Sequence, residues 1–199
     1  MIRVSRLEGD GLRARLDDVA ALRVEVFRAW PYLYSGDRAY EKRYLATLAG
    51  AEGAVVVAAF DTSVPRRDRT VGVATASPLR HHHAEFAAPF SRAGLDVSEW
   101  FYLAESVLLK EYRGQGLGVR FFHEREAAAR EQGYGKCCFC AVARDGDHPR
   151  RPPGYVPLDA FWRNRGYAPL DGVTATFHWR EVGGAQEVPH EMQFWGRDL

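Results

Sequence analysis

The chain has 199 residues, enough for one domain with a substantial apolar core. It is 46% hydrophobic and 27% charged, which is typical of a globular protein and excludes an intrinsically disordered one. Its 27 Lys and Arg residues balance 26 Asp and Glu residues, for a formal net charge of +1. This balance gives no electrostatic reason to expect a nucleic acid partner.

No apolar run approaches the roughly 20 residues of a membrane span, so we expect no membrane partner. The first residues, MIRVSRLEGDG, lack the apolar stretch of a signal peptide, and we therefore expect a cytoplasmic protein. No repeat or linker divides the chain, which predicts a single domain over residues 1–199. A homodimer is compatible with the sequence, which does not specify the oligomeric state.

The first half of the chain predicts a strand, two helices and a β-hairpin. Apolar residues at helical spacing indicate the helices, and two apolar runs on either side of a polar turn (64–69) indicate the hairpin. The predicted elements are a strand at 2–7, helices at 11–30 and 38–50, and strands at 53–61 and 70–78.

The second half alternates strands and helices after a segment, 83–96, that is irregular or briefly helical. The loop at 144–157 is rich in Pro, Gly and charge and is long for a compact domain, which favours a functional role. The predicted elements are a central strand at 99–109, a helix at 117–132, a strand at 136–142, a helix at 157–166 and strands around 175–182 and 191–199.

All three cysteines lie in the segment KCCFC, as Cys137, Cys138 and Cys140. The first and last have the C-x-x-C spacing of a metal site, to which His123 or His148 could add a ligand. However, no second Cys pair completes a zinc site, and a reduced Cys behaves as a small hydrophobic residue in a buried strand. We therefore favour a buried strand and predict no metal site.

The stretch EYRGQGLG, residues 111–118, places three glycines between the central strand and the following helix. The first amides of a helix have no internal partners and lie at the positive end of its dipole. Glycines allow an anion to approach these amides, and Arg113 adds a formal charge. The corner is therefore built like a phosphate site, with a glycine-rich turn that binds nothing as the alternative. It is neither a Walker loop nor a G-x-G-x-x-G fingerprint.

This stretch resembles motif A of the GNAT acetyltransferase superfamily, whose pattern is Gln/Arg-x-x-Gly-x-Gly/Ala and which here reads Arg113-x-x-Gly116-x-Gly118. The segment AFWRNRGY (160–167) is similar to a family segment in which an aromatic-rich helix ends in Gly and an aromatic residue. The order of elements also matches over nearly the whole chain. The resemblance implies an α/β (α+β) fold, with a mixed, mostly antiparallel central sheet flanked by helices and with splayed central strands.

The resemblance also implies acetyl-CoA as the donor cosubstrate. In the family, the amides of motif A hold the CoA pyrophosphate, and pantetheine pairs with backbone at the end of the preceding strand. An amide at this strand end would also polarise the thioester carbonyl. Carried onto this sequence, the pyrophosphate residues are Arg113, Gly114, Gln115, Gly116, Leu117, Gly118 and Val119, and the pantetheine residues are Val107, Leu108 and Leu109.

Glu105 is the candidate general base, because family members often use a carboxylate on the strand before motif A. It is the only acidic residue within the apolar run FYLAESVLL. A buried strand rarely carries an unpaired Glu, and burial would raise the pKa of such a carboxyl. The alternative is that a structural Arg or the backbone satisfies Glu105. Tyr102 and the histidines at 81–83 are weaker candidates.

The candidate general acid departs from the family pattern. The family often places a Tyr in the helix before the Gly-aromatic pair, to reprotonate the CoA thiolate. The matching residue here is Trp162, which cannot donate an acid proton. Either another group serves, for which we take Tyr155, or the thiolate leaves without help.

The acceptor site implied by the resemblance is the turn between the first two helices, AWPYLYSGDRAYE. Its aromatic and acidic residues, Tyr32, Tyr34, Asp37 and Glu41, suit a cation. The alternative is that the two tyrosines only pack as a corner between helices. We place His82, with its two His neighbours, in a loop near the acceptor mouth. Consecutive residues in an extended chain point to opposite faces, so these histidines do not suit one metal.

The function implied by the resemblance is transfer of an acetyl group from acetyl-CoA to a primary amine of a small molecule, peptide or protein. The glycine corner and Glu105 favour this enzyme. A non-catalytic domain that binds or senses acyl-CoA is the alternative, and Trp162 favours it. Without the resemblance, the residues indicate an α/β protein with a phosphate-bearing ligand. They do not specify the acceptor amine.

Overall fold

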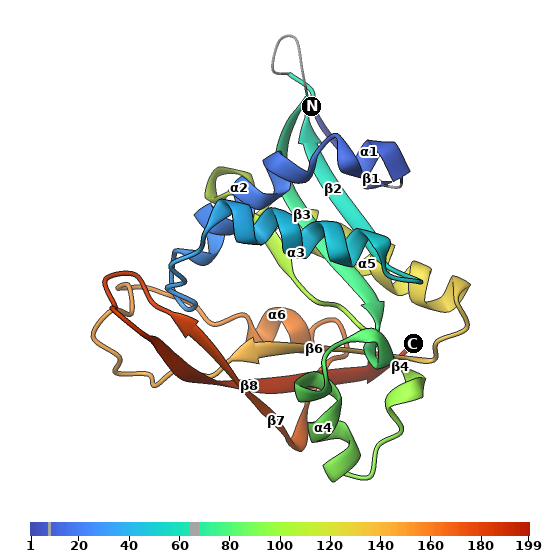
Figure 1. Cartoon of the computed structure of the whole chain (residues 1–199), viewed down its shortest axis with the longest axis vertical. Helices are drawn as coiled ribbons and strands as arrows, with labels where there is room; N and C mark the ends of the chain where they lie inside the picture. The colour runs from blue at the N-terminus through green and yellow to red at the C-terminus, as the bar shows by residue number, and fades with distance from the viewer. Residues whose placement is uncertain (8, 64–67) are drawn as a thin grey trace.

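The computed structural model describes residues 1–7, 9–63 and 68–199 (Figure 1). The strands are β1 (Ile2–Leu7), β2 (Val55–Asp61), β3 (Arg69–Pro78), β4 (Trp100–Tyr102), β5 (Ser106–Leu108), β6 (Lys136–Val142), β7 (Ala168–Arg180) and β8 (Glu187–Asp198). The α-helices are α1 (Gly9–Arg13), α2 (Leu16–Phe27), α3 (Arg38–Gly50), α4 (Ala84–Arg92), α5 (Leu117–Glu131) and α6 (Asp159–Arg163).

The strands form one sheet in the order β1-β2-β3-β4-β6-β8-β7, and β5 pairs with β3 beyond the end of β4. Among the described residues, β4 and β6 form the only parallel pair, and the other pairs are antiparallel. The sheet is therefore mixed and mostly antiparallel, and helices flank it. This confirms the fold class that the sequence predicts.

The two halves of the sheet are joined through the short strand β4. This strand pairs with the end of β3 on one side and with the first residues of β6 on the other. The last shared contact is the hydrogen bond from Leu103 N–H to the Cys138 carbonyl, at 2.7 Å. Beyond it β5 stays with β3, while the rest of β6 pairs with β8. The two halves are consequently joined at β4 and separate with increasing distance from it, as Figure 1 shows.

A β-bulge lies at the point where the halves separate. Ala104 N–H donates to the Thr75 carbonyl, and Thr75 N–H donates to the Glu105 carbonyl, each at 3.0 Å. Two residues of one strand therefore oppose one residue of β3, which bends the strand and ends its regular pairing. The predicted continuous strand at 99–109 is thus two short strands with a bulge between them.

Helices cover both faces of the sheet. Figure 1 shows α2 and α3 in front of the half formed by β1, β2 and β3, with α5 behind it. Side chains of α2 and α5 share one buried apolar cluster with β2 and β3. In the other half, α6 packs with α5 against one face of β6 and β8, and α4 packs against the opposite face. Helix α5 therefore packs against both halves of the sheet, through Leu117 and Phe121 in one cluster and Phe122 and Ala129 in the other.

Most predicted elements are present, with local differences. The helix predicted at 11–30 is two helices, α1 and α2, and the segment 83–96 contains α4. The KCCFC segment lies in β6, and its three thiols are free and buried, as predicted for a strand. The polar turn predicted at 64–69 falls largely on residues 64–67, which lie outside the described residues. Among the described residues, no helix is both long and apolar enough to cross a membrane.

Candidate active site

The glycine corner leads from β5 into α5. Gly114 and Gly116 have φ values of +75° and +77°, in the left-handed region, and no atom lies within 4 Å of a Cβ placed at either. Gly116 is the N-cap of α5, whose first residues Leu117, Gly118 and Val119 present amides without an intrahelical partner. The corner is exposed and its backbone is accessible, which suits contact with an anion.

Arg113 links the corner to the strand that precedes it, because its Nε donates to the Leu108 carbonyl at 3.2 Å. Gln115 turns back on the same loop, where its amide donates to the Glu111 carbonyl at 3.3 Å. The side chains of Arg113 and Gln115 are exposed. The guanidinium therefore lies at the end of the open edge of β5, beside the corner amides.

Of the three predicted pantetheine residues, not all have backbone groups on the edge of β5 that faces away from β3. Val107 is in register with Val73, and Leu109 N–H donates to the Val71 carbonyl at 3.0 Å, so both residues pair with β3. Backbone groups of an antiparallel pair alternate in direction, and those of Leu108 point the other way. The backbone groups of Ser106 also point away from β3, although Ser106 was not among the predicted residues. The sequence does not show where the bulge lies, so it does not show which residues of β5 face away from β3.

Glu105 lies in the bulge, and its carboxylate forms an ion pair with Arg23 of α2. The same guanidinium binds Glu41 of α3, with 2.6 Å between Nε and Oε2. The side chains of Arg23, Glu105 and Glu41 are 10%, 9% and 1% exposed. The structure therefore places Glu105 and Glu41 in one buried cluster, which we call the Arg23 cluster. Glu41 is a buried partner in this ion-pair cluster.

The Arg23 cluster holds two carboxylates and one guanidinium. Burial lowers the pKa of Arg23, but Glu105 and Glu41 raise it more, so the net shift is upward. The neighbouring Tyr44 has a raised pKa, first because of Glu105 and then because of burial. With both carboxylates ionised, the cluster carries one negative charge in excess. Such a cluster favours a cation nearby.

The two predicted tyrosines lie against the Arg23 cluster. Burial raises the pKa of Tyr32, and the nearby Cys140 and Glu105 add to this shift. Burial also raises the pKa of Tyr34, and the nearby Glu41 carboxylate adds to this shift. Both phenols are therefore neutral. The structure brings Tyr32, Tyr34, Glu41 and Glu105 together.

An arginine that the sequence analysis did not select fixes the turn that carries these tyrosines. Arg144, in the loop after β6, donates from Nε to the Pro31 carbonyl at 2.8 Å and from Nη2 to the Tyr32 carbonyl at 3.2 Å. It also pairs with Glu181, at 2.7 Å. Trp179 Nε1 donates to the same Tyr32 carbonyl at 3.0 Å. The turn is thus held by segments far away in the sequence, for which no local signal exists.

Tyr155 and Trp162 have different surroundings. The Tyr155 ring is 6.0 Å from Trp30, and burial raises its pKa, with Asp159 adding to the shift while Arg151 and Arg113 oppose it. Tyr155 therefore packs beside Trp30. Trp162 is partly buried and packs against the core, 5.1 Å from the rings of both Phe139 and Trp195.

Asp37 and His82 lie at the margins of the site. Asp37 accepts a hydrogen bond from Tyr40 N–H at 2.7 Å in the first turn of α3, which is the role of a helix cap. His82 Nε2 is 2.7 Å from the Ser77 hydroxyl, and its ring packs 4.8 Å from Tyr102. Burial lowers the pKa of His82 to about 4, with His83 and His81 adding to the shift. His82 is therefore neutral and lies near α4.

The buried thiols are also neutral. Burial raises the pKa of Cys137 and of Cys140 to about 12, and Cys140 Sγ lies 3.0 Å from the Tyr102 hydroxyl. Within residues 1–7, 9–63 and 68–199, no group of three or more His, Cys, Asp or Glu side chains is arranged to hold a metal ion.

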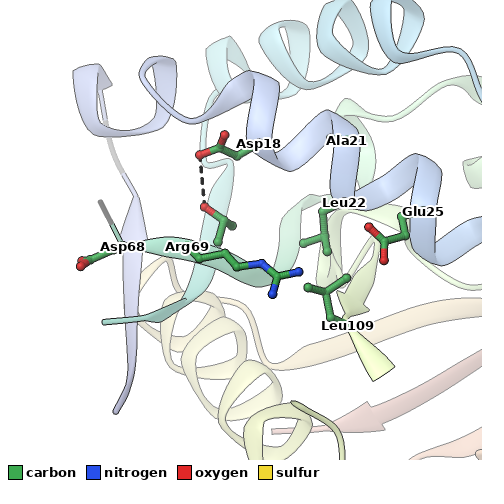
Figure 2. A pocket seen from close by; sticks show the side chains of 8 residues that line it. Asp18, Ala21, Leu22, Glu25, Asp68, Arg69 and Leu109 are labelled. Atoms are coloured by element: carbon green, nitrogen blue, oxygen red, sulfur yellow. Dashed lines mark hydrogen bonds between the residues drawn. The ribbon is translucent and has the colours of Figure 1, made fainter. Parts of the chain in front are cut away.

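A separate cavity of about 270 Å³ lies between α2 and the start of β3 (Figure 2). Its apolar floor includes Leu22 and Leu109, and Arg69 crosses its mouth toward Glu111, 3.6 Å away. Three acidic side chains also line it, and among them Asp68 binds Arg3 at 2.7 Å. Of the predicted site residues, the cavity includes Leu109 alone, so it is distinct from the cluster around Glu105.

The family model described as the acetyltransferase (GNAT) family matches residues 19–152. This range includes the glycine corner, the bulge and the Arg23 cluster. No curated protein matches the chain.

Solved structures of acetyltransferases share the fold over nearly the whole chain. A ribosomal-protein-alanine N-acetyltransferase from Brucella melitensis is 17% identical, with a TM-score of 0.60 and coverage of 100% of this chain and 99% of that chain. Arabidopsis thaliana NAA60 with acetyl-CoA is 13% identical, with a TM-score of 0.65 and coverage of 100% and 99%.

An aminoglycoside 6'-N-acetyltransferase complexed with coenzyme A is 14% identical, with a TM-score of 0.61 and coverage of 98% and 96%. At these identities the likeness concerns the fold. The match of the family model covers more than half of the chain. The chain therefore belongs to the GNAT acetyltransferase family.

Proposed function

We propose that the protein is an acetyl-CoA-dependent N-acetyltransferase that acts on a primary amine of a small molecule, peptide or protein. One observation carries this proposal: an open strand edge connects a buried carboxylate to the glycine corner. The edge begins at the Glu105 bulge, includes Leu108 and ends where Arg113 reaches the Leu108 carbonyl. This order fits acetyl-CoA, with the thioester near the carboxylate, the arm along the strand edge and the pyrophosphate at the glycine corner.

The donor would lie along this edge. The amides from Gly114 to Val119 bind the pyrophosphate, with Arg113 as a neighbouring positive charge. Ser106 and Leu108 offer backbone groups to the pantetheine arm, because their direction is away from β3. A backbone N–H at this edge would also stabilise negative charge on the thioester carbonyl oxygen as it develops.

The chemistry needs a neutral amine, so an incoming ammonium must first lose a proton. In our proposal Glu105 accepts this proton, directly or through a water molecule. The amine nitrogen then forms a bond to the carbonyl carbon and releases its second proton to a water molecule, and the carbon–sulfur bond breaks. The sulfur leaves with both electrons of that bond as CoA thiolate. Tyr155 is the proposed donor of the proton that converts the thiolate to the thiol.

The acceptor would approach from the side of Tyr32 and Tyr34. The excess negative charge of the Arg23 cluster favours a cationic amine over a neutral or anionic compound. Proteins with this fold act on quite different amines, including a ribosomal protein and an aminoglycoside. This range supports an amine acceptor in our proposal and leaves its identity to experiment.

A second function has support from the same residues. The ion pair with Arg23 occupies Glu105, and Trp162, which packs against the core, cannot donate an acid proton. Both features favour a domain that binds acyl-CoA without transferring the acyl group. The two functions share the donor site and differ in turnover.

The test combines CoA binding with an assay of thiol release. Calorimetry measures the affinity for CoA, and acetyl-CoA is then incubated with polyamines, aminoglycosides, amino acids and peptides with free N-termini. The hydroxyl analogue of the best amine and a reaction without acceptor are the controls. Release that requires the amine supports the enzyme. Binding without release across the panel supports the second function, and absence of CoA binding contradicts both.

A further inference from the structure

Arg125 is a buried charge that the proposed mechanism does not use. It lies on α5, is 1% exposed and is among the largest fully buried side chains. Buried charges are normally paired with an opposite charge, yet Arg125 forms none of the ion pairs found among the described residues. Instead its guanidinium binds uncharged oxygens. Burying a charged group costs desolvation free energy, so packing alone does not explain an arginine at this position.

The partners of Arg125 surround the bulge. Its Nε donates to the Phe121 carbonyl of its own helix at 3.0 Å. Its Nη1 donates to the carbonyls of Thr75 and Glu105, each at 3.2 Å. Its Nη2 donates to the Ser106 hydroxyl at 2.8 Å. One guanidinium therefore holds both strands of the bulge.

The two bulge carbonyls already accept backbone hydrogen bonds. The Thr75 carbonyl accepts from Ala104 N–H, and the Glu105 carbonyl accepts from Thr75 N–H. Arg125 adds a second, charged donor to each of them, and charge-assisted hydrogen bonds are stronger than neutral ones. The bonds that define the bulge and the bonds to Arg125 share the same oxygens. Moving the guanidinium would therefore disturb the bulge directly.

We propose, on the basis of the proposed function, that Arg125 is a positioning residue for the active site. It fixes the bulge, and with it both the opening between β5 and β6 and the direction of the Glu105 side chain. Arg125 lies on α5, the helix that begins at the glycine corner. It therefore also fixes the position of the β5 edge relative to that corner.

The side chain type fits this role. The neighbouring residues on the same face of α5, such as Phe121, Phe122 and Ala129, are apolar and buried, so an apolar residue would pack at this position. An apolar side chain would leave the bulge carbonyls without their second donor. A lysine is a point charge without the planar fork that reaches several oxygens at once. Burial lowers the pKa of Arg125 to about 10, which keeps it charged at neutral pH.

The experiment compares Arg125→Met and Arg125→Lys with Ala129→Gly. Ala129 lies one turn further along the same buried face, so its variant destabilises α5 without changing a hydrogen bond to the bulge. Each protein is studied at a temperature at which circular dichroism shows it to be folded. The measurements are CoA affinity by calorimetry, the rate of acetyl transfer to the best amine, and hydrogen exchange of the amides at 104–108.

We expect Arg125→Met to lower kcat/KM for acetyl-CoA by about 10²-fold, the scale of a misplaced reacting group. CoA affinity should fall with it, and exchange at 104–108 should become faster. Arg125→Lys should recover part of the activity. Ala129→Gly should lower the Tm while both kinetics and exchange stay near the parent. A structural role alone would give Arg125→Met the same profile as Ala129→Gly.

A folded Arg125→Met protein with parental CoA affinity, rates and exchange overturns the proposal. If Arg125→Met does not fold, Arg125→Lys and Ser106→Ala take its place, and parental behaviour in both has the same meaning. A parent protein that binds no CoA contradicts the proposed function instead. The exchange measurement then decides the role of Arg125 at the bulge by itself, since it needs neither ligand nor activity.

Discussion

At the residue scale, the role of Glu105 depends on how one arginine is shared. Arg23 binds two carboxylates, and it also packs over the rings of Tyr44 and Phe27, at 4.8 and 5.3 Å. An arginine stays charged in proteins, so it cannot release Glu105 by losing its proton. For Glu105 to accept a proton from the amine, Arg23 must keep enough contact with Glu41 to remain satisfied. In our proposal, Glu41 is the structural carboxylate of this pair and Glu105 is the reacting one.

Glu105→Gln should slow acetyl transfer by about 10²–10⁴-fold at neutral pH, the usual scale of general base catalysis. The loss should shrink at high pH, where the amine is already neutral. CoA affinity should barely change, because the pyrophosphate site lies at the glycine corner. The measurement is a pH–rate profile together with the Tm.

Glu41→Gln is the matched control, since it breaks the other ion pair of Arg23 and leaves Glu105 intact. It should lower the Tm and, because the cluster loses its excess negative charge, raise the KM for a cationic amine, while the pH dependence of kcat stays that of the parent. A stable Glu105→Gln protein with nearly parental rates at neutral pH would remove Glu105 from the mechanism. A deficit that is equal at all pH values would identify Glu105 as structural.

Gly116→Val should abolish measurable CoA binding while the fold persists. A β-branched side chain would project into the open space above the helix amides and block the pyrophosphate. The control is Gly133→Val at the other end of α5, where φ is +82° and the space is equally open. Backbone strain should destabilise both variants by a similar amount, about 1–3 kcal/mol. Calorimetry should therefore show lost CoA binding for Gly116→Val and retained binding for Gly133→Val, and equal affinities would contradict the phosphate site.

The candidate site residues that can be selected from the sequence are those with local signals. The glycine corner is visible because three glycines, an arginine and a helix start are adjacent in the chain. Arg23 and Arg125 carry no such signal, because their partners come from other elements. In the sequence each is one charged residue in an amphipathic helix, where solvent exposure is the usual outcome. Only the folded chain shows that both point inward at Glu105.

At the element scale, the predicted strand at 99–109 illustrates what hydrophobic pattern can and cannot specify. The run is apolar throughout, so it indicates a buried strand without indicating its register. The bulge at Ala104 and Glu105 results from pairing with Thr75 and from the guanidinium of Arg125. These partners are distant in the sequence. The sequence therefore predicts the element, and tertiary contacts determine its interruption.

The segment that contains His82 and α4 should respond to acid. In an unfolded chain the pKa of a histidine is about 6.5, whereas burial lowers that of His82 to about 4. Between these values the unfolded chain binds more protons than the folded one, so stability decreases as the pH falls. The loss between pH 7 and pH 5 should be about 1–2 kcal/mol, reduced from the full shift because His82 is only partly buried.

His82→Gln should flatten this dependence, since a glutamine can bind the Ser77 hydroxyl without taking up a proton. The exposed neighbour gives the control, and His83→Gln should keep most of the parental slope. The measurement is the Tm between pH 5 and pH 7. An unchanged slope in His82→Gln would mean that other groups cause the acid sensitivity.

At the scale of the whole molecule, the candidate site lies where two half-sheets meet. One half carries Glu105 and the glycine corner, and the other carries β6 and the loop with Arg144. The halves are joined by the pairing of β4 and by the turn that Arg144 and Trp179 hold. The family fold could be predicted from the order of elements. The contacts that hold the halves apart could not be predicted, because they are hydrogen bonds between segments that are distant in the sequence.

CoA should stabilise the molecule as a whole if its arm lies between the halves. A ligand that binds the folded state alone adds about 2.7 kcal/mol at a concentration 100 times its Kd. For a chain of this length that corresponds to a rise in Tm of roughly 5–10 °C. Hydrogen exchange should slow at Ser106 and Leu108 and also along the facing residues of β6, because the arm would cover both edges. Gly116→Val should show neither change at the same concentration. Protection confined to the glycine corner would place the pyrophosphate there but the arm elsewhere, and would contradict a donor site between β5 and β6.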